Sequence, residues 1–351
     1  MILKDVIKKF DKSNIKAGDG LEKGNYPLYT CSPIINKYLN DFLYEDEALI
    51  ISTGGNFSIH YVNGKFNYST DCYVFNTDKY NLKYLYYYLL SKKDDINKMF
   101  RGAGLKHLNK NEFVMLNLKE ISENEQCDVV NRLDKINEMI ELRKNEIEKC
   151  NNLIKSQFVE MFGDPVFNSK KWKQYRLKQL GYFGRGISKH RPRNAPELLN
   201  GPYPLIQTGD VSNSDLYINS YSSTYSELGL KQSKMWPSGT LCITIAANIA
   251  QTSILTFDAC FPDSVVGFIA NNMTNNIFMH YWFGFLQKII DSKATQVAQK
   301  NINLQILSEL DVITPPIELQ NKFAQIVEQI DKQKFVGTKI ARLLGKIAIL
   351  C

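Results

Sequence analysis

The amino-acid sequence lacks the signatures of a metal site, a secreted scaffold and a membrane protein. Its seven cysteines include no C-x-x-C pair and its four histidines are scattered, which argues against a zinc site. Scattered thiols in a long chain are typical of a reduced, cytoplasmic protein. No run of about 18 apolar residues could span a membrane, and the chain start, residues 1–5, has no signal-peptide core. We therefore expect a cytoplasmic protein without a metal.

Motifs of nucleotide-binding and hydrolytic enzymes are also missing. The sequence has no G-x-G-x-x-G after a strand, no G-x-x-x-x-G-K-[ST] and no G-x-S-x-G. The signature of amino-group methyltransferases, Asn or Asp before Pro-Pro and an aromatic, is absent, since Pro315-Pro316 lies between Thr314 and Ile317. We expect no catalytic residue and no cofactor bound by this chain.

The chain does have a globular composition and a small excess of positive charge. Of its 351 residues 44% are apolar and 23% are charged, which excludes disorder as the dominant state. Only 20 glycines and 11 prolines exclude a collagen-like chain. The 43 Lys and Arg outnumber the 36 Asp and Glu, for a net charge of +7. This charge permits a nucleic-acid partner without requiring one.

The sequence repeats itself with a period of roughly 190 residues, too long for a solenoid. The matches occur in the same order in both copies, which predicts a tandem duplication of a globular domain followed by a long helix. They pair residues 26–30 with 203–208, 49–56 with 241–248, Asp71 with Asp263, Asn81 with Asn275, 104–109 with 298–303, and Val129 with Ile326.

Each globular domain has the mixed pattern of an α+β fold with a twisted sheet. Short β-type runs cover 48–53 and 240–245, and apolar helices are expected at 81–90 and 275–286. The domains we expect are 1–120 (first globular domain), 121–165 (central long helix), 166–314 (second globular domain) and 315–351 (distal long helix).

Both long helices carry apolar residues at heptad spacing, and no Pro or Gly interrupts 123–162. A seam kept through about five heptads predicts a partner seam, so we expect the two helices to form an antiparallel coiled coil. The alternative is two separate surface helices. The expected seam residues are Val129, Leu133, Ile136, Ile140, Ile147, Ile154 and Phe158 in the first helix and Phe323, Ile326, Ile330, Ile340, Leu344 and Ile347 in the second, with Gln333 and Gly337 as weak positions.

An antiparallel pair of this kind would hold two similar domains, related by an approximate two-fold, at opposite ends of a rod. Such an arrangement suits a ligand with two sites at fixed spacing, and duplex DNA is one because half-sites recur with the helical turn.

Basic and polar loops recur at matching places in the two copies. Residues 184–194 (GRGISKHRPRN) are the richest segment, and residues 8–16 are their counterpart. Such side chains contact phosphates and base edges, although solvated surface loops are the alternative. The candidate DNA-contacting residues are Lys12, Ser13, Asn14, Lys16, Thr30, Ser32, Asn56, Lys106 and His107 in the first copy and Arg185, Ser188, Lys189, His190, Arg191, Arg193, Thr208, Asp210, Asn248, Lys300 and Asn301 in the second.

The order of these features resembles the specificity subunits of type I restriction–modification systems. Three strings carry the resemblance: QFVEMFGDP at 157–165 with Trp172 and Leu177 after it, YPLIQTGDV at 203–211, and PPIELQ at 315–320. The first long helix departs from the family pattern, because its start lacks Pro-Pro-x-x-x-Gln.

The resemblance implies a non-catalytic subunit with two target-recognition domains, each reading one half of a bipartite site in double-stranded DNA. The coiled coil would set the distance between the half-sites and dock two methyltransferase subunits, which carry S-adenosylmethionine. Two restriction subunits that translocate DNA can join them. Two alternatives stay open: the recognition subunit of a combined restriction–methylation enzyme that cuts both sides of its site (type IIB-like), and a coiled-coil scaffold that binds only proteins.

Overall fold

A computed structural model describes residues 1–245, 250–286 and 304–350, without the side chains of 341, 342 and 345–350. The chain divides into two compact units, which are described separately. Unit 1 comprises Met1–Arg143 together with the chain from Lys339 onward, and unit 2 comprises Lys144–Thr338. In the part of the chain that is described, no helix is both long enough and apolar enough to cross a membrane.

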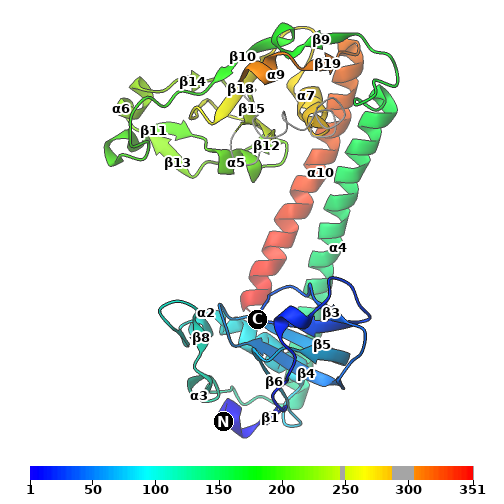
Figure 1. Ribbon diagram of the computed structural model, residues 1–351, viewed down its shortest axis with the longest axis vertical. Helices are drawn as coiled ribbons and strands as arrows, with labels where there is room; N and C mark the ends of the chain where they lie inside the picture. Colours follow the sequence, from blue (N-terminus) through cyan, green and yellow to red (C-terminus); the bar gives the residue numbers. More distant parts are fainter. Residues whose placement is uncertain (246–249, 287–303, 351) are drawn as a thin grey trace. The chain divides into compact units, whose positions relative to one another are not determined.

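Unit 1 is built on a six-stranded sheet with the order β1-β6-β4-β5-β2-β3, coloured blue in Figure 1. Strand β4 alternates between two apolar clusters: Leu49 and Ile51 pack on one side, and Ala48 and Ile50 on the other. The strands are β1 Lys8–Lys9, β2 Tyr26–Tyr29, β3 Tyr38–Leu39, β4 Tyr44–Ser52, β5 Ile59–Tyr68 and β6 Cys72–Asn76.

Helix α1 (Leu82–Ser91) covers one face of this sheet. It begins after Asn81, whose side-chain oxygen accepts the N–H groups of Lys83 and Tyr84 at 3.0 and 3.1 Å. The helix expected at 81–90 is therefore confirmed. The smaller elements of unit 1 are η1 Leu3–Asp5, η2 Ala17–Asp19, α2 Lys93–Asn97, β7 Phe100–Arg101, β8 His107–Leu108 and α3 Lys110–Phe113.

Unit 2 contains a five-stranded sheet, β10-β18-β15-β16-β12, and a four-stranded sheet, β13-β11-β17-β14. Helix α7 (Asn276–Phe283) begins after Asn275, as α1 begins after Asn81, and ends before the expected limit of 286. The strands are β9 Gln174–Arg176, β10 Gly181–Arg185, β11 Leu199–Leu205, β12 Tyr217–Ile218, β13 Ser223–Tyr225, β14 Met235–Trp236, β15 Leu241–Thr244, β16 Thr252–Leu255, β17 Ala259–Cys260, β18 Val265–Ala270 and β19 Asp311–Ile313. The smaller helices are η3 Leu177–Gln179, η4 Pro196–Leu198, α5 Thr208–Ser212, α6 Glu227–Lys231 and α9 Leu304–Ser308.

The strand order of unit 1 is repeated in unit 2. Strands β1, β6, β4 and β5 correspond in order to β10, β18, β15 and β16. Leu28 of β2 pairs in parallel with Asn67 of β5, and Leu205 of β11 pairs in parallel with Cys260 of β17. The α+β class and the tandem duplication expected from the sequence are confirmed.

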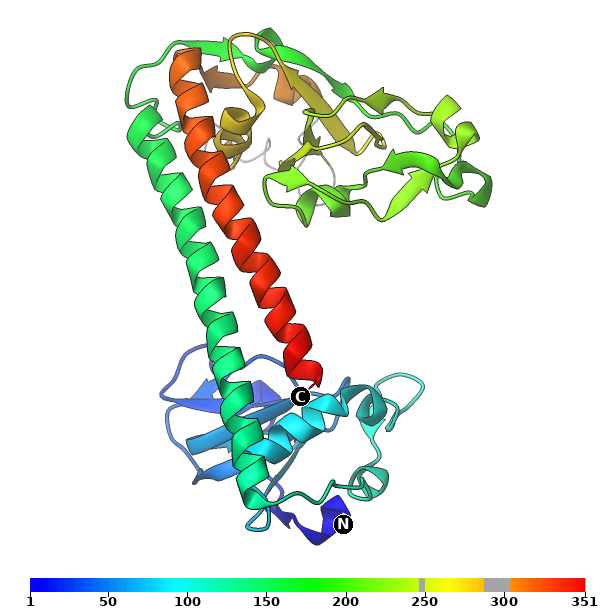
Figure 2. The same cartoon turned by 180° about the vertical axis from the view of Figure 1, so that it is seen from behind.

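The two long helices are α4 (Glu123–Phe162) and α10 (Ile317–Leu350). Within unit 2 they run antiparallel, side by side in both views (Figures 1 and 2). Phe158 and Phe162, near the end of α4, contact Phe323, near the start of α10, with ring centres 5.5 and 5.4 Å apart. Further along, Ile147 of α4 lies against Gly337 of α10.

Most of the expected seam residues are at least half-buried. Leu133, Ile154, Phe158, Phe323 and Ile330 are buried. Val129, Ile136, Ile140, Ile147, Ile326, Ile340 and Leu344 are half-buried, and the side chain of Ile347 lies outside the described ones.

The prediction of Gln333 as a seam residue is wrong. Gln333 is exposed, and the next residue, Lys334, is buried at 5% exposure. The buried positions of α10 follow Phe323, Val327, Ile330 and Lys334, a spacing of four and three that places Lys334 inward. Its ammonium group forms ion pairs with Asp215 and Asp331, which compensate the buried charge.

A shared hydrogen-bond cluster joins each globular domain to the start of its long helix. In unit 1 the Gln126 side chain accepts the Asn81 N–H (2.8 Å) and donates to the Ile121 carbonyl (3.2 Å). In unit 2 the Gln320 side chain accepts the Asn275 N–H (3.3 Å) and donates to the Pro315 carbonyl (2.8 Å). The sequence separations are 45 and 5 residues in both units. Gln126 therefore corresponds to Gln320.

This correspondence overturns one match of the sequence comparison. Val129 lies three residues after Gln126, so it corresponds to Phe323 and not to Ile326. The error arose because a heptad pattern resembles itself after a shift of three or four residues. The start of the first long helix thus keeps the glutamine of the Pro-Pro-x-x-x-Gln pattern and lacks only its prolines.

Candidate nucleic-acid interface

In unit 1 a hollow of about 440 Å³ lies among residues that follow β2, follow β4 and precede β6. Its lining includes Cys31, Asn56, Asp71 and His107. The Cys31 thiol donates to the Asp71 carbonyl (3.1 Å), and the Gly55 N–H donates to the Lys106 carbonyl (2.9 Å). The fold therefore brings three predicted segments, 30–32, 56 and 106–107, to one place.

The predicted hydroxyl residues beside this hollow brace the backbone. Thr30 Oγ1 accepts the Ser32 N–H at 3.2 Å, and the Ser32 carbonyl lies 2.9 Å from His60 Nε2. Asn56, Lys106 and His107 are exposed. Of these three, Asn56 and His107 line the hollow, and Lys106 is the chain neighbour of His107.

The predicted loop at 12–16 lies next to the turn that contains Asp71. The Thr70 N–H donates to the Ile15 carbonyl at 2.8 Å. Ser13 is buried and its hydroxyl accepts the Ile15 N–H at 3.1 Å, so this residue shapes the loop. Lys12, Asn14 and Lys16 are exposed.

Two lysines that the sequence analysis missed extend this basic surface. The ammonium groups of Lys9 and Lys110 lie 5.4 and 5.8 Å from the centre of the Tyr73 ring. Burial lowers the pKa of Lys110, and the neighbouring charges of Lys9 and Lys12 lower it further. Because the charges of Lys9 and Lys12 both act on Lys110, the three lysines lie near one another, and the charge of Asp71 opposes their effect on the pKa of Lys110. Lys9 could have been selected from the sequence, because it belongs to the basic segment 8–16.

In unit 2 the predicted basic loop packs on the turn between β17 and β18. Arg185 Nε donates to the Asp263 carbonyl at 2.9 Å. The Asp263 carboxylate pairs with Arg193 at 2.5 Å and with Arg191 at 3.7 Å. The close approach requires a glycine at position 186, because a Cβ there would lie 2.1 Å from the Phe261 carbonyl oxygen. Three cationic side chains are thereby gathered around one aspartate.

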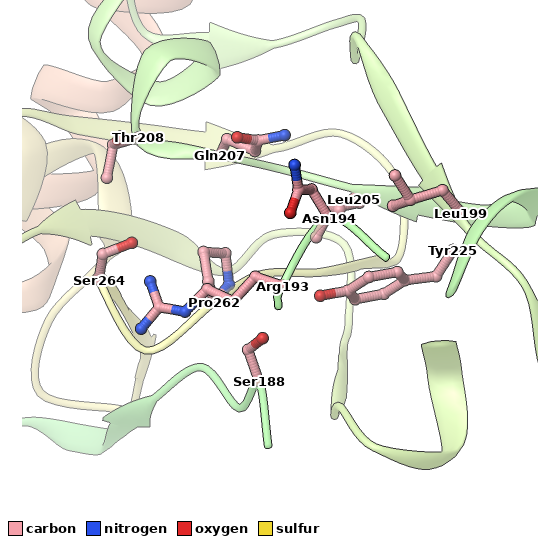
Figure 3. Close-up of a pocket in the computed structure, with 10 residues that line it drawn as sticks. All are labelled: Ser188, Arg193, Asn194, Leu199, Leu205, Gln207, Thr208, Tyr225, Pro262 and Ser264. Carbon is pink, nitrogen blue, oxygen red and sulfur yellow. The ribbon is translucent and has the colours of Figure 1, made fainter. Parts of the chain in front are cut away.

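A hollow of about 250 Å³ adjoins this cluster and is shown in Figure 3. Its polar lining includes Ser188, Arg193, Asn194, Gln207 and Thr208. The amide groups of Asn194 and Gln207 point toward one another in Figure 3. These residues follow β10 and β11, and Pro262 and Ser264 precede β18. Residues after β2 and before β6 line the hollow of unit 1 in the same way.

The remaining predicted residues of unit 2 have mixed surroundings. Lys189 is exposed, whereas His190 is half-buried and its Nδ1 lies 3.3 Å from the Pro192 carbonyl. The Asp210 carboxylate accepts the Gln207 N–H at 2.8 Å and so stabilises the start of α5. Ser188 is buried at 6% exposure. Asn248, Lys300 and Asn301 lie outside the described residues.

Asn194 and Gln207 are functional candidates that the sequence analysis did not select. Both amides can form paired hydrogen bonds with adenine, and both line the hollow. Each is the immediate neighbour of a selected residue, Arg193 or Thr208. Arg193 and Thr208 line the same hollow, so the selected positions were right and only the adjacent amides were missed.

Two α+β units with a repeated strand order, each followed by a long helix, define a duplicated recognition protein. The chain matches the family described as type I restriction modification DNA specificity domain twice, over residues 1–152 and 169–343. It belongs to this family, as its resemblance to specificity subunits implied. Specificity subunits are recognition subunits without catalytic activity, which accounts for the missing enzyme motifs.

Individual relatives agree with this assignment. The chain is 23% identical over 354 residues to the type I restriction enzyme EcoDI specificity subunit of Escherichia coli, covering 92% of this chain and 79% of that protein. Its fold resembles the crystal structure of the type I restriction–modification S subunit from M. genitalium, with a TM-score of 0.63, 16% identity and coverage of 99% and 93%. A chain from a structural study of type I system assembly and conformational transition has a TM-score of 0.53, 16% identity and coverage of 88% and 81%.

Proposed function

We propose that each unit of this specificity subunit reads one half of a bipartite DNA site. The observation that carries the proposal is the repeated location of the two polar hollows. In both units, residues after β2 or β11 and residues before β6 or β18 line a hollow. Cationic side chains lie on the neighbouring loop at 12–16 in unit 1 and around Asp263 in unit 2. A duplicated fold that presents polar and basic groups at the same place suits a ligand with two similar sites.

The residue types in the two hollows suit direct readout of DNA sequence. Lysine and arginine bind phosphates, while Asn194, Gln207, Asn56 and His107 can form hydrogen bonds with base edges. Because the cationic groups would displace counterions from DNA, the affinity of the assembled complex should fall steeply as the salt concentration rises.

We assign the long helices two tasks: setting the distance between the half-sites and docking the methyltransferase subunits. In this proposal two methyltransferase subunits supply S-adenosylmethionine, and two restriction subunits complete the complex in the cytoplasm. The antiparallel contact of α4 and α10 within unit 2 supports a rigid spacer. The comparisons favour neither a type IIB-like assembly nor a scaffold that binds only proteins.

The test is methylation-sensitive sequencing of DNA from cells that carry the intact system. We expect one bipartite motif with two defined halves and a fixed gap. Replacing residues 166–314 by those of a relative should change only one half of the motif. A swap that changes both halves, or a wild-type system that methylates no bipartite motif, would contradict the proposal.

A further inference from the structure

The cationic groups of the two units differ in how they are compensated. In unit 2 the carboxylate of Asp263 pairs with both Arg193 and Arg191. Arg191 is held further, since its Nη1 donates to the carbonyls of Ser188 (2.6 Å) and His190 (2.8 Å). In unit 1 the matching Asp71 is exposed, and among the described residues its carboxylate forms no ion pair with Lys9, Lys12 or Lys110, although its charge raises the pKa of Lys110.

The ion pair with Arg193 lies at the edge of the hollow of unit 2. Arg193 lines this hollow (Figure 3). It also pairs with Asp263, so the carboxylate influences where the guanidinium group lies. The Arg193 side chain is 45% exposed, so DNA can reach it, whereas Asp263 Oδ1, the atom that pairs with it, is buried. A phosphate that binds Arg193 must compete with Asp263 for the same guanidinium group.

This competition has different consequences for target and non-target DNA. Binding to any duplex relies on phosphate contacts, and an arginine whose charge is already compensated contributes less to them. Binding to the target adds contacts with base edges, which require the side chain in one orientation. A carboxylate that holds the arginine therefore weakens binding to every duplex and retains the orientation that the target needs.

We propose that Asp263 is a positioning residue that determines specificity: its carboxylate holds Arg193 and Arg191 beside the unit 2 hollow and suppresses binding to non-target DNA. This inference rests on the proposed function, because it requires that unit 2 reads a half-site. Arg193 is the residue through which Asp263 acts, and Arg191 secures the loop that carries it.

The test uses the full chain assembled with its methyltransferase subunits, carrying Asp263→Asn. Binding is measured by fluorescence anisotropy, over a series of salt concentrations, on a duplex with the sequenced motif and on one with a scrambled second half-site. We expect Asp263→Asn to bind the scrambled duplex about 3- to 10-fold more tightly, with a salt dependence steeper by about one released ion. Its preference for the target should fall by a similar factor.

Two control variants separate this effect from net charge and from misfolding. Asp258→Asn removes one negative charge from the same unit. The Asp258 carboxylate accepts the Ser238 N–H and, among the described residues, forms no ion pair with an arginine, so the variant should leave the preference unchanged. Asp263→Glu keeps the charge and should restore most of the preference.

Each possible result decides the inference. Equal effects of Asp263→Asn and Asp258→Asn, or equal losses of target and scrambled binding, would overturn the role of Asp263 while the proposed function stands. A wild-type complex that does not distinguish the two duplexes would overturn both. Methylation of additional sequences in the second half of the motif by cells with Asp263→Asn would support the inference independently.

Discussion

The two units use the same connection between globular domain and long helix but surround it with different chemistry. In unit 1, Asp134 of α4 binds Lys83 and Tyr87 of α1, both at 2.6 Å. In unit 2 the contacts that join α4, α7 and α10 are aromatic: Phe158 stacks on Phe278 and packs edge-on against Phe323. The glutamine cluster that binds Asn81 or Asn275 is the same in both.

The comparison shows which part of the connection the fold requires. Hydrogen bonds to a helix N-terminus are directional, so the glutamine sets the position of the long helix relative to α1 or α7. The contacts around the glutamine only need to fill space and pair charges. They therefore differ between the two units, with an aspartate in unit 1 and phenylalanine rings in unit 2. The basic surfaces diverged similarly, with lysines in unit 1 and paired arginines in unit 2.

The largest effect should come from the aromatic contacts of unit 2. Phe158 is fully buried against four phenylalanine rings, so Phe158→Ala should lower the free energy of unfolding by about 3–5 kcal/mol. In unit 1, Asp134→Asn should cost only about 1 kcal/mol, because its ion pair is partly exposed. Urea denaturation of the full chain measures both. Val159→Ala, at the exposed neighbouring residue, serves as a control. If it lowers the free energy of unfolding as much as Phe158→Ala does, the packing argument is refuted.

Acid should weaken unit 2 through a group that unit 1 does not have. Burial lowers the pKa of His280 from its ordinary 6.5 to about 4, although Asp215 opposes this shift and Lys334 adds to it. The unfolded chain therefore binds a proton that the folded chain rejects, and stability falls as the pH drops from about 6.5 to 4. The slope from this residue reaches about 1.4 kcal/mol per pH unit.

The variant His280→Gln should remove this part of the pH dependence. The corresponding residue of unit 1 is Tyr86, whose pKa is raised by burial and which does not titrate in this range. His107→Gln, at an exposed histidine of unit 1, is the matched control. The measurement is the urea midpoint of each variant between pH 4 and 7. If stability depends on pH as steeply in His280→Gln as in the wild type, this histidine is not the cause.

The smallest difference between the two units should be that between their glutamine clusters. Gln320 binds Thr274, Asn275, Met273 and Pro315, so Gln320→Ala should cost about 2–3 kcal/mol. Gln126 forms the counterparts of only two of these hydrogen bonds, with Asn81 and Ile121. Gln126→Ala should therefore cost about 1–2 kcal/mol. Thermal unfolding of both variants, compared with the exposed Gln325→Ala, tests the order. A reversed order would mean that the two clusters are not equivalent.

Local patterns in the sequence were sufficient to predict much of the fold. The heptad spacing and the absence of Pro and Gly predicted a helix that the structure has at Glu123–Phe162. The asparagines before two apolar runs predicted where α1 and α7 begin. The candidate site was only partly predictable. Thr30, Asn56 and His107 or their neighbours do lie around one hollow, but Asn194, Gln207 and Lys110 were not selected.

The sequence by itself determined the duplication, the two long helices and the basic character of the matching loops, because each is written in consecutive residues or in repeated strings. Only the tertiary structure decided which distant groups meet. Asp263 reaches Arg193 because β10 pairs with β18 and Gly186 admits the close approach. Lys334, not Gln333, is buried because packing against α4 and a distant Asp215 select the inward face of α10. Such contacts depend on strand register and helix packing, which no local pattern specifies.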